Sequence, residues 1–218
     1  MNSIILHLKK RIIMKPQPTC FGFDSVKMFF VALLFASTLN AVAQNTTSEP
    51  AHSGIYLTLT DFHAGKLTYE IDCSSEKHKI KLHDFAGKSH IDVIHDGVKY
   101  TLQKKDIYAF ADCDNHVFRF FNNSEYQLHE SLPINIYSRQ ESEQQYKGFK
   151  LVDAYYFSVG DTGQIRPLTI LNLKSAFPGN HKFHDMLDEN FKNDGELSAY
   201  DSFHKSYRVN HLYQMSLQ

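Results

Sequence analysis

Short alternating runs of apolar and polar residues, separated by turn-forming residues, fill the chain from Gly54 to about Ser158. Successive side chains of a strand point to opposite faces, so this alternation indicates strands with one buried face. The pair Asp96-Gly97 favours the two-residue turn of a β-hairpin. Regularly spaced short strands predict an antiparallel β meander that forms a small barrel or sandwich. The expected strands are residues 55–57, 78–82, 91–94, 98–102, 107–111, 117–121, 126–128, 134–137 and 149–159.

Helical periodicity replaces this pattern after residue 165. Thr169 is a suitable N-cap for a helix that ends at Ala176, and Asn180 is one for a second helix. Because short helices are marginal alone, we expect a C-terminal helical cap of two to three short helices packed on the β part, an α+β fold. The second helix has one apolar stripe, formed by Phe183, Met186, Leu187 and Phe191. A third helix is expected to carry Leu197, Tyr200, Phe203 and Tyr207.

Residues 28–43, MFFVALLFASTLNAVA, combine an apolar run with a small-x-small pattern at the end. This is typical of a signal peptide that is cleaved between Ala43 and Gln44. The apolar stretch is short for a membrane span, and an uncleaved N-terminal anchor is the alternative. Met14 is followed at once by Lys15, which makes Met14 an alternative start. We therefore expect a periplasmic or extracellular protein with no membrane span after cleavage.

The expected domains are a targeting segment (1–43), a flexible leader (44–53), a β-rich domain (54–164) and a C-terminal helical region packed on it (165–218). The chain is 42% hydrophobic and 22% charged, which is a globular composition. Without the targeting segment it has 18 basic and 23 acidic residues, a net charge of about −5. Because phosphate neutralisation needs clustered basic residues, nucleic acid is not an expected partner.

Several stretches of the mature chain resemble proteins of one family. They are IRPLT, NLKSAFPGNHKFHDMLDENF and LSAYDSFHKSYRVNHL near the C-terminus, and KIKLHDF, DGVKYTLQKKDIYAF and FRFFNN in the middle. The chain resembles an uncharacterised family of exported proteins from Bacteroidota-type bacteria, over most of its mature length. The resemblance implies an envelope location and makes the C-terminal helices part of the fold. It implies no known activity, so no functional residue is carried over from it.

Cys73 and Cys113 are the only cysteines after the targeting segment, and neither belongs to a Cys-x-x-Cys motif. An oxidising compartment favours a disulfide between them, and closing a loop of about forty residues stabilises a fold by about 3–4 kcal/mol. Two partly buried thiols are the alternative, because a sequence does not show whether two Cβ atoms meet.

A polar cluster on the second expected helix is a candidate metal site. Histidine and carboxylate side chains three or four residues apart share a helix face and can hold zinc or another divalent ion. The alternative is a set of hydrated surface pairs, because the spacing is not His-Glu-x-x-His. The four residues are His181, His184, Asp185 and Asp188.

Two other acidic motifs are better explained as turns. Asp161-Thr162-Gly163 has the core of the aspartic-protease motif, but Gly160 and Gln164 are wrong flanks for it. The run 112–115, Asp-Cys-Asp-Asn, lacks the central Gly and terminal Glu of a calcium loop. A phosphate loop, a dinucleotide fingerprint and a Gly-x-Ser-x-Gly motif are absent from the sequence, so no cofactor is predicted.

Tight aromatic runs at residues 118–121 and 155–157 suggest a binding surface. Alternation sends neighbouring side chains to opposite faces, so one aromatic of each run faces away from the core unless helices cover that face as well. An exposed aromatic strip suits a sugar, peptide or protein partner, and burial on both faces is the alternative. The candidate binding residues are Phe118, Phe120, Tyr155 and Tyr156.

Because no complete catalytic constellation is present, the first hypothesis is a non-enzymatic binding or interaction module of the cell envelope. Its partner would be a protein or an envelope glycan. A metal-assisted hydrolase that uses the His181/His184 helix is the second hypothesis. A structural component of an envelope assembly is the third.

Overall fold

The computed structural model describes residues 52–74, 79–83, 87–146 and 148–218. The expected targeting segment, its cleavage site between Ala43 and Gln44, and nearly all of the leader lie outside the described residues.

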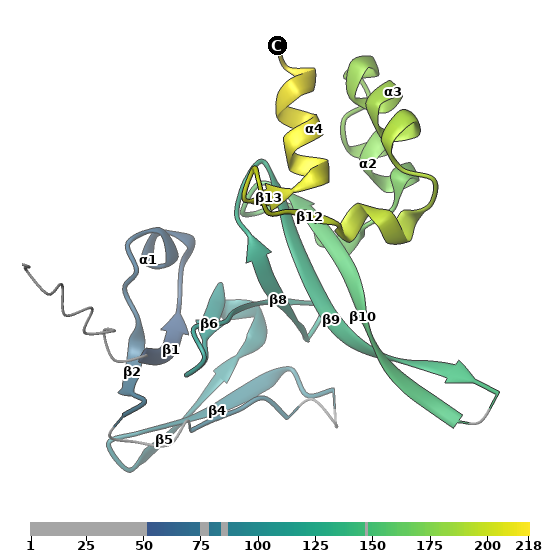
Figure 1. Cartoon of the computed structure of the whole chain (residues 1–218). Helices are drawn as coiled ribbons and strands as arrows, with labels where there is room; N and C mark the ends of the chain where they lie inside the picture. The colour runs from purple at the N-terminus through teal and green to yellow at the C-terminus, as the bar shows by residue number, and fades with distance from the viewer. Residues whose placement is uncertain (1–51, 75–78, 84–86, 147) are drawn as a thin grey trace, which may run out of the picture. The chain divides into compact units, whose positions relative to one another are not determined.

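An eight-stranded antiparallel sheet forms the framework, in the order β11-β10-β9-β8-β7-β6-β1-β2 (Figure 1). The run from β6 to β11 is consecutive, so the predicted meander is confirmed. The sheet is open, with β11 and β2 as edge strands, so the sandwich-like alternative is the observed one. The strands are β1 (His52–Tyr56), β2 (Thr68–Asp72), β6 (Ala109–Ala111), β7 (Val117–Phe121), β8 (Ser124–Glu130), β9 (Ile134–Gln145), β10 (Gly148–Val159) and β11 (Arg166–Pro167).

A second, three-stranded antiparallel sheet packs on the first. It consists of β3 (Ile80–Lys81), β4 (His90–His95) and β5 (Val98–Gln103). Asp96 and Gly97 connect β4 to β5 with positive φ angles of 51° and 74°, which the predicted two-residue hairpin turn requires. Ile91 and Val93 of β4 are fully buried in one apolar cluster with Phe110 of β6, and this cluster joins the two sheets.

The C-terminal helices begin where the capping residues predict. In α2 (Ile170–Ala176) the Thr169 hydroxyl accepts a hydrogen bond from the backbone N–H of Asn172. In α3 (His181–Asn190) the Asn180 side-chain oxygen accepts one from the backbone N–H of Phe183. Each cap satisfies an N–H that lacks a partner inside its helix. Both predicted helices are therefore confirmed.

These helices and α4 (Arg208–Ser216) cover the start of β9 and the end of β10 (Figure 1). Phe183 and Leu187 of α3 are fully buried with Ile136 of β9 and Phe157 of β10. α4 is fixed to β9 through Asn210, whose buried side chain bonds both the N–H and the C=O of Ile134. The prediction of a helical cap on the β part is confirmed.

The predicted helix through Leu197 and Tyr207 is wrong. That stretch forms a short 3-10 helix, η3 (Asp194–Ser198), and a hairpin of β12 (Tyr200–Asp201) and β13 (Ser206–Tyr207). The Asp201 carboxylate accepts hydrogen bonds from the backbone N–H groups of Phe203 and His204, which holds the chain in a turn. Such local bonds compete with helix formation. The third helix, α4, begins only after this hairpin.

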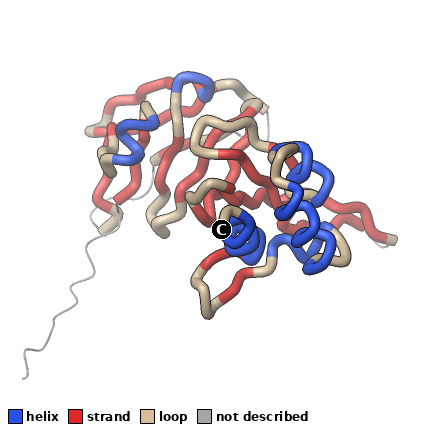
Figure 2. Tube along the Cα trace, turned by 90° about the horizontal axis from the view of Figure 1, so that it is seen from above, coloured by secondary structure: helices blue, strands red, loops and turns tan. Residues whose placement is uncertain are grey.

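β10 matches the strand predicted at 149–159, but β9 continues well past its predicted end at Tyr137, so the two form a long hairpin. They pair without interruption from Ile134 opposite Val159 to Gln145 opposite Gly148. β8 pairs with β9 no further than Ser138, and β11 pairs with β10 only at residues 156 and 157. The remainder, residues 139–146 and 148–154, is a two-stranded arm that extends past the helices in Figure 2.

Cys73 and Cys113 form a disulfide, with their Cα atoms 5.6 Å apart, so the predicted pairing is confirmed. The bond ties the end of β2 to the turn between β6 and β7. A short helix, α1 (Leu59–His63), connects β1 to β2, and its N-cap is Thr58 in a capping box with Asp61. In the part of the chain that the structure describes, no helix has the length and apolar character needed to cross a membrane.

Candidate functional site

One face of the eight-stranded sheet carries two of the three apolar clusters, the one under the helices and the one under the three-stranded sheet. Residues paired across antiparallel strands point to the same face, so the register places Phe118, Gln127, Ser138 and Tyr155 in one row on it. Towards β6, this face is covered by the three-stranded sheet. Towards the start of β9, it is covered by the helices. A stretch of β7, β8, β9 and β10 between them belongs to neither cluster.

A cleft of about 760 Å³ lies on this stretch. Its volume is within the range of about 300–1,000 Å³ that is usual for small-ligand sites. Four adjacent strands contribute its side chains, so the sheet fixes their spacing. The lining residues are Phe118, Glu125, Gln127, Ser138, Arg139, Gln140, Ser142, Leu151 and Asp153.

Most of these side chains are polar, and four of them have no hydrogen-bonding partner among the described residues. Gln140 lies opposite Asp153, and Ser142 opposite Leu151, so the polar row continues along β9 and β10. The side chains of Gln127, Gln140, Ser142 and Asp153 form no hydrogen bond with any other described residue. The cleft therefore presents amide, hydroxyl and carboxylate groups at fixed positions for a ligand.

Ser138 and His129 form a close pair at the edge of the cleft. His129 Nε2 lies 2.7 Å from Ser138 Oγ. Burial lowers the pKa of His129, against the opposing influence of the Asp153 carboxylate. A neutral histidine beside a serine hydroxyl is the first part of a nucleophilic site. No hydrogen bond between His129 and a carboxylate orients the ring within the described residues, so the pair is not a complete triad.

Apolar side chains extend the same face onto the arm. Leu151 lines the cleft and is 62% exposed, and Phe149, two residues away on the same strand face, is 77% exposed. Tyr146, at the end of the hairpin, is fully exposed. Large exposed apolar side chains on one segment mark an interaction surface more often than a chance exposure.

The four aromatic residues that the sequence predicts as a binding surface lie in different parts of the structure. Phe118 lines the cleft and stacks on Phe110, with ring centroids 4.9 Å apart. Tyr155 shares the face of Phe118 but packs against the helices. Tyr156 lies on the opposite face and packs edge-on against Tyr126. Of the four predicted residues, the structure brings only Phe118 into the cleft.

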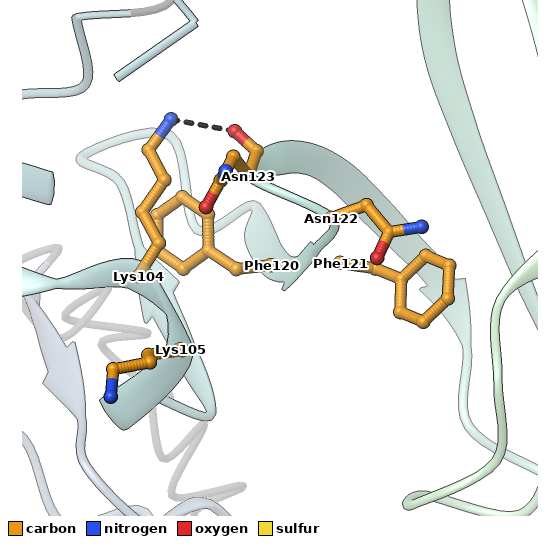
Figure 3. A pocket seen from close by; sticks show the side chains of 6 residues that line it. All are labelled: Lys104, Lys105, Phe120, Phe121, Asn122 and Asn123. Atoms are coloured by element: carbon orange, nitrogen blue, oxygen red, sulfur yellow. Dashed lines mark hydrogen bonds between the residues drawn. The ribbon is translucent and has the colours of Figure 1, made fainter. Parts of the chain in front are cut away.

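The fourth, Phe120, is buried beside a smaller pocket of about 270 Å³ (Figure 3). There the buried Lys104 donates a hydrogen bond of 2.8 Å from Nζ to the Asn123 carbonyl and lies over the Phe120 ring. Glu125 is a further charged neighbour at 4.0 Å. The contacts fix the turn between β7 and β8, which explains why a lysine is buried there.

The four predicted metal ligands on α3 differ in their surroundings. Two of them have protein partners, and the other two are exposed. His184 Nε2 donates a hydrogen bond to the Phe177 carbonyl, and Asp188 pairs with Lys174 at 2.6 Å. His181 and Asp185 are exposed. Among the described residues, only two other groups gather three ligand atoms within 4.8 Å of one another: His83, His90 and Asp92, and Asp112, Asp114 and His116.

Both acidic motifs form turns, as predicted. The Asp112 carboxylate accepts hydrogen bonds from the backbone N–H groups of Asp114 and His116, which closes the turn between β6 and β7. Asp161 follows β10 and accepts hydrogen bonds from side chains of neighbouring segments. Its carboxylate thus has structural partners.

The chain has been compared with family models, with curated proteins and with solved structures, and it matches none of them. The sequence reasoning missed the polar residues of the cleft, because no motif contains them. The one signal for them is the polar alternation of residues 138, 140, 142 and 144, all Ser or Gln, on one strand face.

Proposed function

We propose that this protein is an exported, non-enzymatic binding module whose cleft holds a hydroxyl-rich ligand such as an oligosaccharide of the cell envelope. The observation that carries the proposal is the row of Gln127, Gln140, Ser142 and Asp153, held on adjacent strands without hydrogen-bonding partners among the described residues. The strand pairing sets the spacing of these residues, so several of the groups can bind one ligand at the same time.

The chemistry of the lining supports an uncharged, hydroxyl-rich ligand. The amides of Gln127 and Gln140 both donate and accept hydrogen bonds, and the Asp153 carboxylate accepts them, so sugar hydroxyls can be bound in either direction. The Phe118 ring and Leu151 supply apolar walls for the non-polar face of a sugar ring. The lining combines acidic and basic side chains, so the cleft does not select a strongly charged ligand.

Three features support export. The segment before Gln44 has the pattern of a signal peptide. The Cys73–Cys113 disulfide suits an oxidising compartment such as the periplasm or the extracellular space. The resemblance to exported proteins of Bacteroidota-type bacteria agrees with both.

Isothermal titration of the mature protein against a panel of soluble envelope oligosaccharides tests the proposal. We expect saturable binding of at least one oligosaccharide, and a Kd raised tenfold or more in the Gln140→Ala and Asp153→Ala variants. Glu143→Ala is the matched control, because Glu143 is exposed on β9 but faces the opposite side of the sheet. Absence of binding, or an equal loss in the control, would contradict the proposal. Turnover that is lost in Ser138→Ala would make the protein an enzyme instead.

The arm favours a second candidate function, the docking of an envelope protein. Phe149 and Leu151 offer apolar anchors, and the polar cleft residues would form the rim around them, which is the usual anatomy of a protein interface. A protein that co-purifies with the wild type but not with a Phe149→Ser variant would support this function, because Phe149 does not line the cleft. Oligosaccharide affinity that is unchanged in that variant would separate the two candidates.

A further inference from the structure

His83, His90 and Asp92 converge on the outer face of the three-stranded sheet. His90 and Asp92 are two residues apart on β4, so their side chains share one strand face. Ile91 and Val93, on the other face, point into the core between the sheets. His83 follows β3 by two residues, and its positive φ of 56° turns the chain at this point. The group is independent of the cleft.

The ligand atoms of the three side chains all lie within 4.8 Å of one another, and His83 Nε2 is 2.7 Å from Asp92 Oδ2. Bonds of about 2.0–2.2 Å from zinc to nitrogen and oxygen bring ligand atoms to roughly 3.3–3.5 Å apart around a tetrahedral ion. The ligand atoms would therefore have to shift by about 1 Å to surround one ion.

The surroundings of Asp92 prepare its carboxylate for a metal. Asp92 is only 5% exposed, and Oδ1 accepts a hydrogen bond of 2.7 Å from Thr101 Oγ1, its partner residue on β5. This bond fixes the carboxylate and leaves Oδ2 directed at the histidines, as an outer hydrogen bond does for many metal-bound carboxylates.

We propose that His83, His90 and Asp92 bind one divalent transition-metal ion of the zinc class, with at least one coordination position left for water or a further ligand. The two imidazoles favour zinc and its neighbours over calcium and magnesium, which prefer ligand sets made of oxygen atoms, and the carboxylate is an ordinary third ligand of zinc. Lys99 Nζ lies 2.8 Å from Asp92 Oδ2, and the metal would displace it from there. Its side chain is 61% exposed, so it can move into solvent.

Titration of chelator-treated mature protein with Zn²⁺ and Co²⁺ tests the site. We expect one ion per chain, visible absorption bands for bound Co²⁺, and a Kd raised at least tenfold in His83→Ala and in His90→Ala. Lys99→Met should bind as tightly as the wild type or more tightly, because a competing cation is removed. His181→Ala, an exposed histidine on α3, is the matched control and should bind like the wild type.

A measurement on the wild-type protein guards against variants that fail to fold. In ¹H–¹⁵N spectra of the histidine side chains, Zn²⁺ should shift the imidazoles of His83 and His90 and no others. Absence of stoichiometric binding, binding that survives in both histidine variants, or binding that is lost in His181→Ala would overturn the proposal.

Discussion

Gly163 belongs to a run of residues that resembles a catalytic motif, but the structure requires a glycine there for packing. It closes the turn after β10, where a Cβ atom would lie 2.3 Å from the Val159 carbonyl oxygen. We expect Gly163→Ala to lower the free energy of unfolding by about 1–3 kcal/mol, because the backbone must shift to relieve the overlap. Urea denaturation measures this loss. Gly179→Ala is the control, since a Cβ there meets nothing within 4 Å, and an equal loss in both variants would contradict the explanation.

Asp161, in the same turn, makes stability depend on pH. Burial raises its pKa, but hydrogen bonds from Asn135, His63 and Ser131 outweigh this, so the folded-state pKa lies below the usual value. A lowered pKa stabilises the fold above the unfolded-state pKa of about 3.9, and the stabilisation is lost as the pH falls through the folded-state pKa. The carboxylate must therefore be ionised for the turn to be held.

We expect Asp161→Asn to be about 1–3 kcal/mol less stable than the wild type at pH 7. The difference should shrink as the pH is lowered from 7 through the folded-state pKa of Asp161, because the wild-type carboxyl then becomes protonated as well. Denaturation of both proteins across this pH range measures it. Asp96→Asn is the control, because the Asp96 side chain is 86% exposed. A difference between Asp161→Asn and the wild type that does not change with pH would show that the charge of Asp161 is not the cause.

At the level of secondary-structure elements, the disulfide fixes the β2 side of the large sheet. It closes a loop with a sequence separation of 40 that contains the whole three-stranded sheet. We expect the Cys73→Ser/Cys113→Ser variant to lose about 2–4 kcal/mol, chiefly because its unfolded chain is less constrained. Equilibrium unfolding measures the loss, with reduced wild-type protein as the second comparison. Unchanged stability in both would mean that the loop is already held by its packing.

The elements that sequence reasoning found are those with local physical signals. The Asp96-Gly97 turn and the Thr169 and Asn180 caps each depend on residues close in the chain, and all three are present. The failed helix has the apolar spacing of a helix, but the hydrogen bonds of Asp201 select a hairpin. Periodicity alone does not distinguish the two when a local turn competes with the helix.

The cleft and the β9 strand of the arm could not be found in this way, because their causes are not local. The β10 strand was expected, but β9 beyond Tyr137 contains only Ser, Arg, Gln and Glu, and its pairing with β10 defines it instead. The cleft depends on the register of four strands and on which part of the sheet face remains uncovered. A sequence contains the side chains for such a site but does not show which strands become neighbours.

For the whole molecule, the C-terminal helices and the three-stranded sheet leave the cleft between them on the large sheet. One end of the cleft opens onto the arm. Stability is therefore distributed unevenly. The ends of the sheet face are buried under helices or under the second sheet, whereas the arm has exposed side chains and open edges among the described residues. Segments with few buried contacts open locally before the core does. The arm is thus the part of this binding face that a ligand can order most.

We expect brief chymotrypsin treatment of the folded protein to cut first in the arm, after Tyr146, Phe149 or Leu151. The two fragments should remain associated, because β9 and β10 continue into the covered part of the sheet. A ligand that fills the cleft should slow this cleavage at least several-fold, since it must hold Leu151 in place. Mass spectrometry of the fragments over time measures both effects.

Cleavage after Phe203 is the internal control, because this exposed residue belongs to the β12–β13 hairpin and does not line the cleft. A ligand bound in the cleft should leave the rate at Phe203 unchanged while it protects Leu151. Equal protection at both positions would indicate general stabilisation of the fold. No protection of the arm by a bound oligosaccharide would show that the ligand lies elsewhere, and the arm would then be better explained as a docking site for a protein.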